Sequence, residues 1–331
     1  MKYKNSDSSG SCAVLHTRNE GTPAQVETKP SKKVLYLPEN MIGRDFVIGD
    51  LHGMVPLLRA LLDHVRFDPS GDRLFSVGDL IDRGEDSPGA LDLLDEPWFH
   101  AVRGNHEDML LDYLLSAPDQ QYRLSGSGFT GDHAFLANGG GYWYPENPLT
   151  NNQRANLAQL PHILVVGKDA PGRFHVVHAS LVKNTGDTEP HVHLFSDDEI
   201  DSGLPWGHFR YIQGYDSVGS LRDSLIWDRT FSYAVRDLRC GNVTLKALLG
   251  GFEALSPTYC GHTPVETPIV IGSHHMIDTG AFMTDNPSAG LSMVEIKTGQ
   301  IFTANYAEDD FYIQTRAFLN LDREPAAART V

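Results

Sequence analysis

The chain has 331 residues, a formal net charge of −16 and a calculated isoelectric point near 5.3, and 40% of its residues are hydrophobic. That length can hold one large domain or two ordinary ones, and the apolar share allows a sizeable core. The acidic balance, with no long run of lysines or arginines, argues against nucleic acid or an anionic membrane as the main partner.

The cysteine count and the hydropathy pattern bear on the compartment. The three cysteines are few and odd in number, which does not suggest a disulfide framework. The sequence contains no stretch of about 18 apolar residues, so we predict no membrane span. The polar N-terminus lacks the apolar core of a signal peptide. We therefore expect a cytoplasmic protein with no membrane partner.

In chain order, residues 1–40 mix serine, threonine, asparagine, lysine and glutamate without a sustained period, and we interpret them as a flexible polar leader. Strands are predicted at 45–49, 73–77 and 99–103, and helices at 55–65, 88–95 and 107–116. This alternation predicts an α/β unit with parallel strands. Each of the three strands runs into a polar cluster, and the carboxyl ends of such strands are where α/β sheets place their sites.

The second half of the chain has a different pattern. Short strands are predicted at 174–178, 258–261, 269–272, 276–278, 291–296 and 301–304, and their glycine-rich turns favour a second sheet of meander type. Residues about 117–160 and 183–220 are interpreted as insertions. One folded domain is expected over 41–315, followed by a C-terminal tail over 316–331.

The first polar cluster is the sequence GDLHG at 49–53. Residues two apart in an extended segment point to the same side, so Asp50 and His52 can reach one metal ion together. Gly49 and Gly53 allow the backbone to turn tightly around it.

The second and third clusters are GDLIDRG at 78–84 and RGNHE at 103–107. One carboxylate of the second cluster could bridge two ions, leaving the other and Arg83 for different roles. In the third, Asn105 offers a neutral oxygen ligand and His106 points away from it, so one can bind metal while the other faces substrate.

Two isolated histidines, His178 and His262, follow short strands and suit metal ligation. Each cluster alone has an ordinary interpretation as a turn or a structural histidine. Their conjunction, with each cluster directly after a predicted strand, favours a two-metal hydrolytic site. Two ions about 3.5–4 Å apart can activate a water and clamp a phosphate. Arginines can grip the remaining phosphoryl oxygens, and a protonated histidine can give the leaving oxygen its proton.

At these motifs the chain resembles the phosphoprotein phosphatases, in the bacterial and phage branch of the calcineurin-like metallophosphoesterases. The resemblance covers about residues 44–110 and resumes around 174–181, 227–229 and 260–281. It implies an α/β fold, a two-sheet β sandwich flanked by helices, with the catalytic domain at 41–315.

The resemblance also implies a role for each site residue. Asp50 and His52 would bind the first metal, Asp79 would bridge both, and Asn105, His178 and His262 would complete the second. His106 would be the general acid, oriented by Asp82, while Arg83, Arg103 and Arg229 would hold the phosphate. The ligand types suit two divalent ions, most of all Mn, with Fe or Zn as alternatives.

The expected function is hydrolysis of phosphoserine and phosphothreonine in proteins by a metal-bridging hydroxide, so phosphoproteins or phosphopeptides are the expected partners. A dinucleoside tetraphosphate hydrolase on the same scaffold is the alternative, and a non-enzymatic metal-binding scaffold is a third interpretation. The glycine- and aromatic-rich residues 120–145 could form a lid, although a packed surface loop is favoured. His191 and His193 are interpreted as solvated loop histidines.

Overall fold

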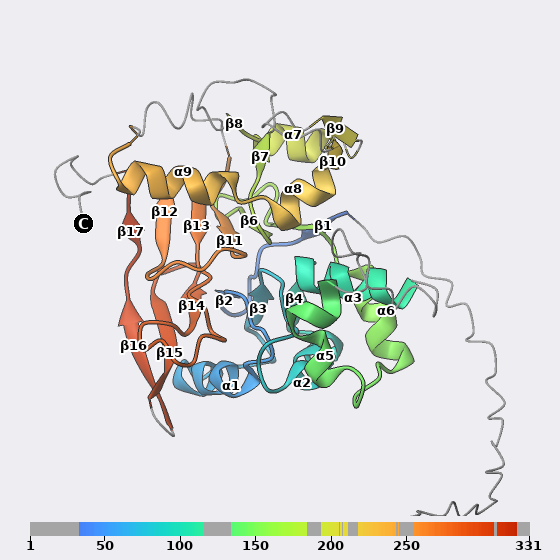
Figure 1. Cartoon of the computed structure of the whole chain (residues 1–331). Coiled ribbons are helices and arrows are strands. Elements are labelled where there is room, and N and C mark those ends of the chain that lie inside the picture. Colours follow the sequence, from blue (N-terminus) through green and yellow to red (C-terminus); the bar gives the residue numbers. More distant parts are fainter. Residues whose placement is uncertain are drawn as a thin grey trace, which may run out of the picture.

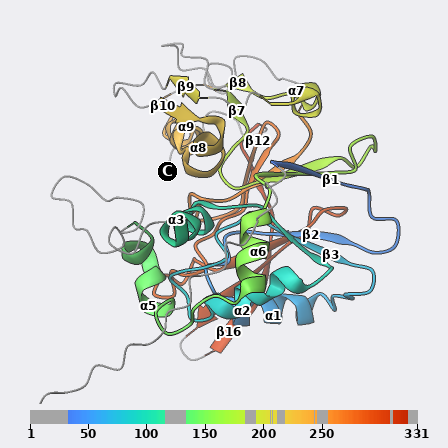
Figure 2. The same ribbon diagram turned by 90° about the vertical axis from the view of Figure 1, so that its right-hand side faces the viewer.

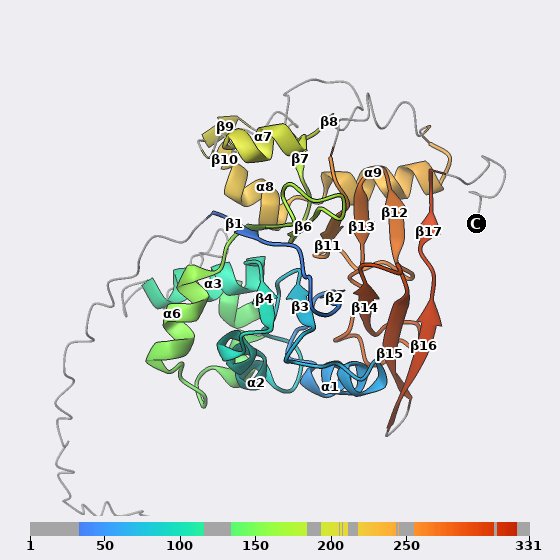
Figure 3. The same cartoon turned by 180° about the vertical axis from the view of Figure 1, so that it is seen from behind.

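The computed structural model describes residues 33–115, 134–183, 193–204, 206, 208–210, 218–242, 244, 255–307 and 310–322. Within them, two large sheets form the middle layers of an α/β/β/α sandwich (Figure 1). The view from behind shows the same layers, with α1 below one sheet and α9 above the other (Figure 3). The expected two-sheet sandwich flanked by helices is confirmed.

The first sheet contains the predicted α/β unit. Its strand order is β16-β15-β14-β2-β3-β4. β2 (Asp45–Ile48), β3 (Arg73–Ser76) and β4 (Phe99–Ala101) are parallel, as predicted from the alternation of strands and helices. β14 (Leu291–Glu295), β15 (Ile301–Ala307) and β16 (Asp310–Arg316) extend it antiparallel.

The second sheet has the strand order β1-β5-β6-β11-β13-β12-β17. Its strands are β1 (Val34–Leu37), β5 (Ile163–Val166), β6 (Phe174–Val177), β11 (Thr258–Cys260), β12 (Ile269–Ile271), β13 (His274–Met276) and β17 (Leu319–Asn320). The pairs β1–β5, β6–β11, β11–β13 and β12–β17 are parallel.

The meander prediction for the second half is therefore wrong. β14 and β15 return to the first sheet, where Met293 pairs with Ile48, and β11 lies parallel to both of its neighbours. Neighbouring strands along the chain usually pair. The rule holds for β12–β13 and for β14–β15–β16, but β2 pairs with β14 and β6 with β11, which are partners from distant parts of the chain.

Ordered structure also extends beyond the expected domain boundaries of 41 and 315. β1 pairs with β5 inside the range assigned to the leader, and β17 pairs with β12 inside the range assigned to the tail. Both are short edge strands, four and two residues long. Such strands carry too few residues to show a periodic pattern. Residues 1–32 and 323–331 lie outside the described residues.

Helices cover the outer face of each sheet. The first sheet is covered by α1 (Val55–His64), α2 (Ser87–Asp92), η1 (Leu93–Asp95), α3 (Asn105–Leu115), η2 (Leu136–Gly140), α5 (Gly141–Trp143) and α6 (Asn151–Gln159). Leu57, Leu58 and Leu61 of α1 are buried, on the face that the leucine spacing predicted. The side that carries α3, α5 and α6 faces the viewer in Figure 2.

The second sheet is covered by α7 (Asp197–Ser202), α8 (Leu221–Trp227) and α9 (Thr230–Arg239). The described parts of the predicted insertion at 183–220 also form two small antiparallel pairs. These are β7 (Val182–Lys183) with β8 (His193–Leu194), and β9 (His208–Arg210) with β10 (Val218–Ser220).

A third apolar cluster joins the two sheets face to face. Phe75 of β3 packs edge-on against Phe174 of β6, with ring centroids 5.4 Å apart. Val47 and Val77 of the first sheet share this layer with Val176 of the second. This apolar layer brings the strand ends of both sheets together at one edge of the sandwich. The polar clusters lie at that edge. Among the described helices, none combines the length and apolar character needed to span a bilayer.

Candidate active site

The site is built on turns that follow five strands, three from the first sheet and two from the second. Most of these turns need unusual backbone. Of the six non-glycine residues with positive φ in the described chain, five lie here: His52, Asp79, Asp82, Arg83 and His262. Residues held in this left-handed region cost free energy that the surrounding structure must offset, and they cluster at functional sites.

Asn105, His178 and His262 converge on one point beside Asp79. Asn105 Oδ1 lies 2.9 Å from both His178 Nε2 and His262 Nδ1, and these two nitrogens are 3.1 Å apart. His178 Nε2 is also 3.4 Å from Asp79 Oδ1. The four side chains are buried.

The hydrogen bonds of the two rings favour a cation among these atoms. His178 Nδ1 lies 2.8 Å from Val77 O and His262 Nε2 lies 3.2 Å from Trp227 O. A carbonyl only accepts, so those ring nitrogens carry the protons. The nitrogens that face Asn105 and Asp79 therefore present lone pairs to other acceptors. Backbone hydrogen bonds that orient a histidine in this way are typical of metal ligands.

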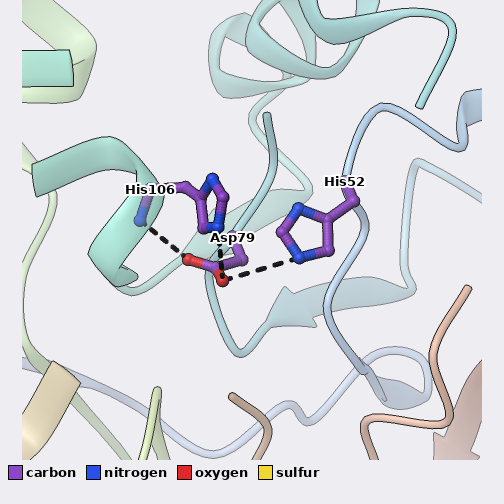
Figure 4. Close-up of side chains that lie close together, drawn as sticks. All are labelled: His52, Asp79 and His106. Atoms are coloured by element: carbon purple, nitrogen blue, oxygen red, sulfur yellow. Dashed lines mark hydrogen bonds and ion pairs between the residues drawn. The ribbon is translucent and has the colours of Figure 1, made fainter. Parts of the chain in front are cut away.

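The first metal position also contains a histidine that is oriented by a backbone carbonyl. His52 Nδ1 lies 2.9 Å from Ile81 O, so Nε2 carries the lone pair. It lies 3.6 Å from Asp79 Oδ2 and accepts from Arg83 Nη1 at 2.8 Å, a contact that a bound ion would replace. Figure 4 shows His52 and His106 on either side of the Asp79 carboxylate. Asp79 belongs to two separate groups of closely spaced ligand atoms, one with His52 and His106 and one with His178 and His262. This arrangement fits a bridging carboxylate between two ions.

Asp50 accepts from the backbone N–H of His262, with both carboxylate oxygens 3.1 Å from the nitrogen. Burial raises the pKa of Asp50 well above its ordinary value, and the charges of Asp278 and Asp79 raise it further. Burial would also raise the pKa of Asp79, but His178, His106 and His52 hold it far below its ordinary value. A buried cluster of carboxylates is costly unless cations neutralise it. The residues present therefore fit two divalent ions.

His106 and Asp82 form a buried pair on the α3 side of this centre. His106 Nδ1 lies 2.6 Å from Asp82 Oδ2, and His106 Nε2 lies 3.9 Å from Asp79 Oδ2. Burial lowers the pKa of His106, but the charges of Asp79 and Asp82 and the hydrogen bond to Asp82 outweigh it, and the net pKa is raised. A raised pKa favours the protonated imidazole that a proton donor needs.

The three predicted phosphate-binding arginines differ in their contacts. Arg83 Nη1 donates to His52 Nε2 at 2.8 Å, and its guanidinium lies over Phe282, 4.4 Å from the ring centroid. Arg229 Nη1 donates to Thr263 Oγ1 at 3.1 Å, next to His262. Arg83 and Arg229 therefore lie beside the first and second metal positions.

Arg103 is turned away from the ligand clusters. Its Nη2 donates to Ala158 O at 3.0 Å, near the C-terminus of α6, and its Nη1 lies 3.6 Å from Asp108 Oδ1.

Glu107 is a site residue to which the sequence analysis assigned no role. Its carboxylate accepts from the backbone nitrogens of Asp79, Leu80 and Gly104 at 2.7–3.0 Å. It thereby ties the second motif to the third. Gly104 allows this contact, because a Cβ there would meet Asp79 N at 2.4 Å. The available signal was the glutamate that closes RGNHE, since an acidic side chain in the first turn of a helix is placed to accept from backbone N–H groups.

Asp278 is a second such residue. It is buried after β13, and its Oδ1 accepts from Gly280 N at 2.8 Å. Burial raises the pKa of Asp278 to about 6, and the charge of Asp79 adds to the effect. An aspartate directly after an apolar strand was the signal, identical in kind to that of Asp50 and Asp79.

Residues 134–144 pack into the molecule rather than over it as a lid. Trp143 is buried, and Tyr144 packs against it with ring centroids 5.8 Å apart, so only Tyr142 of the three aromatics at 142–144 is free to stack on a nucleobase. His193 lies in β8, and no group of potential metal ligands in the described residues includes it. Residues 120–133 and His191 lie outside the described residues.

Comparison with known proteins identifies the class. The family model of the calcineurin-like phosphoesterases matches residues 46–221, which is more than half of the chain. The chain therefore belongs to the calcineurin-like phosphoesterases. Members of this family bind two divalent metal ions, in agreement with the two ligand groups that share Asp79. The proteins of this family are metallophosphoesterases, a class of hydrolases.

Individual relatives support the phosphoprotein phosphatase branch. Serine/threonine-protein phosphatase 2 of Salmonella typhimurium is 32% identical over 198 residues, covering 57% of this chain and 83% of that protein. Serine/threonine-protein phosphatase 1 of the same organism is 48% identical over 96 residues, covering 28% of this chain and 44% of that protein. The symmetrical bis(5'-nucleosyl)-tetraphosphatase of Xylella fastidiosa is 37% identical over 82 residues, 24% of this chain and 28% of that protein. The chain thus spans less than half the length of the phosphatase 1 relative and of the tetraphosphatase.

Proposed function

We propose that the chain is a serine/threonine protein phosphatase that uses two divalent metal ions. We expect both ions to be Mn. The observation that carries the proposal is the position of Asp79 between two groups of ligand atoms with the His106–Asp82 pair beside them. When bound, the two ions would supply Lewis acidity that activates water and neutralises phosphoryl charge. A cytoplasmic location remains a prediction from the sequence.

Each residue of the site has a part in this proposal. Asp50 and His52 would hold one ion, Asn105, His178 and His262 would hold the other, and Asp79 would be shared by both. Arg83 and Arg229 carry N–H donors at the two sides of the centre and would bind the phosphoryl oxygens, with Arg103 as the third donor expected from its motif.

Proton transfer is assigned to His106. Its Nδ1–H is held by Asp82, which leaves Nε2 to protonate the oxygen that departs as the serine or threonine side chain. An alkoxide is a poor leaving group, so the acid is needed for this substrate class.

The extent of the similarities favours the monoester over the dinucleotide. The match to the phosphatase 2 relative spans 83% of that protein, whereas the match to the tetraphosphatase spans 28% of it. Trp143 is buried and the partly buried Tyr144 packs against it, so only Tyr142 of the three aromatics is fully exposed to stack on a base.

The test compares phosphoserine and phosphothreonine peptides with diadenosine tetraphosphate at one Mn concentration. We expect a higher kcat/KM for the peptides, and no hydrolysis of either substrate by an Asp79→Asn variant, which serves as the control for contaminating enzymes. A clear preference for the dinucleotide would overturn the proposal in favour of the tetraphosphatase alternative. No hydrolysis of any phosphate ester would favour the non-enzymatic scaffold.

A further inference from the structure

The segment formed by η2 and α5 lies directly against the Asp82–Arg83 turn. Gly139, in η2, has φ of 124°, and a Cβ at this position would meet Arg83 N at 2.7 Å and Asp82 Cβ at 3.0 Å. The close approach therefore requires glycine on the η2 side. This contact joins a segment that the sequence analysis interpreted as a surface loop to the backbone of the proton-donor pair.

Trp143, four residues further along the chain than Gly139, contacts the Asp82 carboxylate with its side chain. Its Nε1–H donates to Asp82 Oδ1 at 2.7 Å, while the other oxygen, Oδ2, faces His106 Nδ1 at 2.6 Å. Asp82 is fully buried, and each of its two carboxylate oxygens has a partner, the Trp143 indole for Oδ1 and the His106 ring for Oδ2. The backbone N–H of Asp82 donates to Ser87 Oγ at 2.9 Å and holds the turn itself.

These contacts of Asp82 affect the orientation of His106. A carboxylate accepts hydrogen bonds, so His106 carries its proton on Nδ1 when it is neutral, and Nε2 is the nitrogen turned toward the centre. His106 Nε2 is buried and has no hydrogen-bond partner within the described part of the chain. Its direction is therefore set by Asp82, and the rotation of the Asp82 carboxylate is set by the Trp143 indole.

We propose that Trp143 is a positioning residue for the hydrolytic reaction, acting through Asp82 to aim His106 Nε2 at the leaving oxygen. The inference rests on the proton-donor role proposed for His106. It adds a third member to the pair, supplied by the glycine- and aromatic-rich segment and separated from Asp82 by 61 positions in the chain. A packing role alone would explain the contacts of the ring with Phe135 and Tyr144, but not the indole hydrogen bond to Asp82.

The first test is Trp143→Phe, which keeps an aromatic ring and removes the N–H donor. Loss of a hydrogen bond that orients a reacting group typically costs about 10-fold or more. We expect about that loss in kcat/KM for a phosphoserine peptide. p-Nitrophenyl phosphate, whose leaving group needs little protonation, is expected to lose less than about threefold.

Tyr144→Phe is the matched control. It removes one polar atom from the same aromatic cluster, where the Tyr144 hydroxyl accepts from Arg154 at 3.4 Å, and it leaves the Asp82 contact intact. Both substrates are expected to react at the wild-type rate. Bound metal and the thermal midpoint are measured for every variant. If Trp143→Phe does not fold, the isosteric benzothienyl analogue of tryptophan at position 143 removes the N–H while keeping the shape.

A double-mutant cycle separates positioning from packing. If Trp143 acts through His106, adding Trp143→Phe to His106→Asn should cause no further loss on the phosphoserine peptide. Losses that multiply in the double variant, or equal losses on both substrates, would refute the positioning role.

The same experiment distinguishes this inference from the proposed function. If His106→Asn slows both esters equally, the proton-donor role fails and the inference fails with it. If His106→Asn selectively slows the phosphoserine peptide and Trp143→Phe does not, only the role of Trp143 is overturned.

Discussion

At the scale of single residues, the site is a set of acceptors turned toward one another. Asp79 stands at its centre, with one oxygen 3.4 Å from His178 Nε2 and the other 3.6 Å from His52 Nε2. Each histidine has its remaining nitrogen bound to a backbone carbonyl, so neither can donate to Asp79 while neutral. Divalent ions, when bound, would be held by these oxygen and nitrogen atoms.

The prediction at this scale concerns Asp79→Asn. Replacing the shared carboxylate by an amide removes an anionic ligand from both positions, and we expect Mn binding at both to weaken by at least about 10-fold, with hydrolysis abolished. Isothermal titration with Mn and elemental analysis of the dialysed protein measure the first effect independently of activity.

The control is Asp285→Asn, the same change at an exposed aspartate outside the site. It should bind Mn and hydrolyse esters like the parent chain. Retention of both ions by Asp79→Asn, or its full activity in excess chelator, would contradict the shared-ligand model.

At the scale of secondary-structure elements, β13 illustrates how a central strand can carry a polar side chain. His274 is fully buried, and its Nε2 accepts from the backbone N–H of Leu181 at 3.0 Å. Nδ1 must then carry the proton of the neutral ring, and Ser273 Oγ accepts from it at 3.3 Å. Burial, together with the nearby His275 and His175, lowers the pKa of His274 to about 3.

This neutral histidine makes stability depend on pH. The pKa in the unfolded chain is about 6.5, so between pH 6.5 and 3 the unfolded state binds a proton that the folded state does not. The stability contributed by neutral His274 is fully present above pH 6.5 and is lost as the pH falls. We expect the free energy of unfolding to drop by about 2 kcal/mol from this group between pH 7 and 5.

Urea unfolding at several pH values measures this loss. His274→Gln keeps an acceptor for the Leu181 N–H and does not titrate, so its stability should depend less steeply on pH in this range. His64→Gln, the same change at an exposed position, is the control and should keep the wild-type slope. A slope in His274→Gln as steep as in the parent chain would exclude His274 as the source.

At the scale of the whole molecule, the centre is shared between the two sheets. Asp50, His52, Asp79 and Asn105 follow strands of the first sheet, whereas His178 and His262 follow strands of the second. The layer of apolar side chains around Phe75 and Phe174 aligns the two rims. A bound ion at the second position would cross-link the sheets.

We therefore expect metal to stabilise the fold. An ion that binds only the folded chain adds about 3 kcal/mol when its free concentration is 100 times the dissociation constant. Differential scanning calorimetry should show a higher midpoint with Mn than with chelator. The shift should be smaller in His178→Asn, because the second position then loses one of its two ligands from the second sheet. An unchanged midpoint on addition of Mn would show that no ion binds the folded chain in preference to the unfolded one.

Much of the local structure could be predicted from the sequence. The three parallel strands, α1 with its buried leucines, and the polar clusters at the strand ends follow from short-range patterns, because a strand or an amphipathic helix needs only its own residues to show a period. The motifs also predicted a metallophosphoesterase, since their spacing and ligand types are specific to that chemistry.

Long-range pairing was decided by the tertiary structure alone. The return of β14 and β15 to the first sheet, and the docking of β1 and β17 at sheet edges, depend on which distant strand completes a buried face. The hydrogen bond from Trp143 to Asp82 was likewise decided by the tertiary structure alone. A glycine- and aromatic-rich segment has the same sequence whether it lies over a site or packs beneath it, and only the close approach of Gly139 to Arg83 decides between the two.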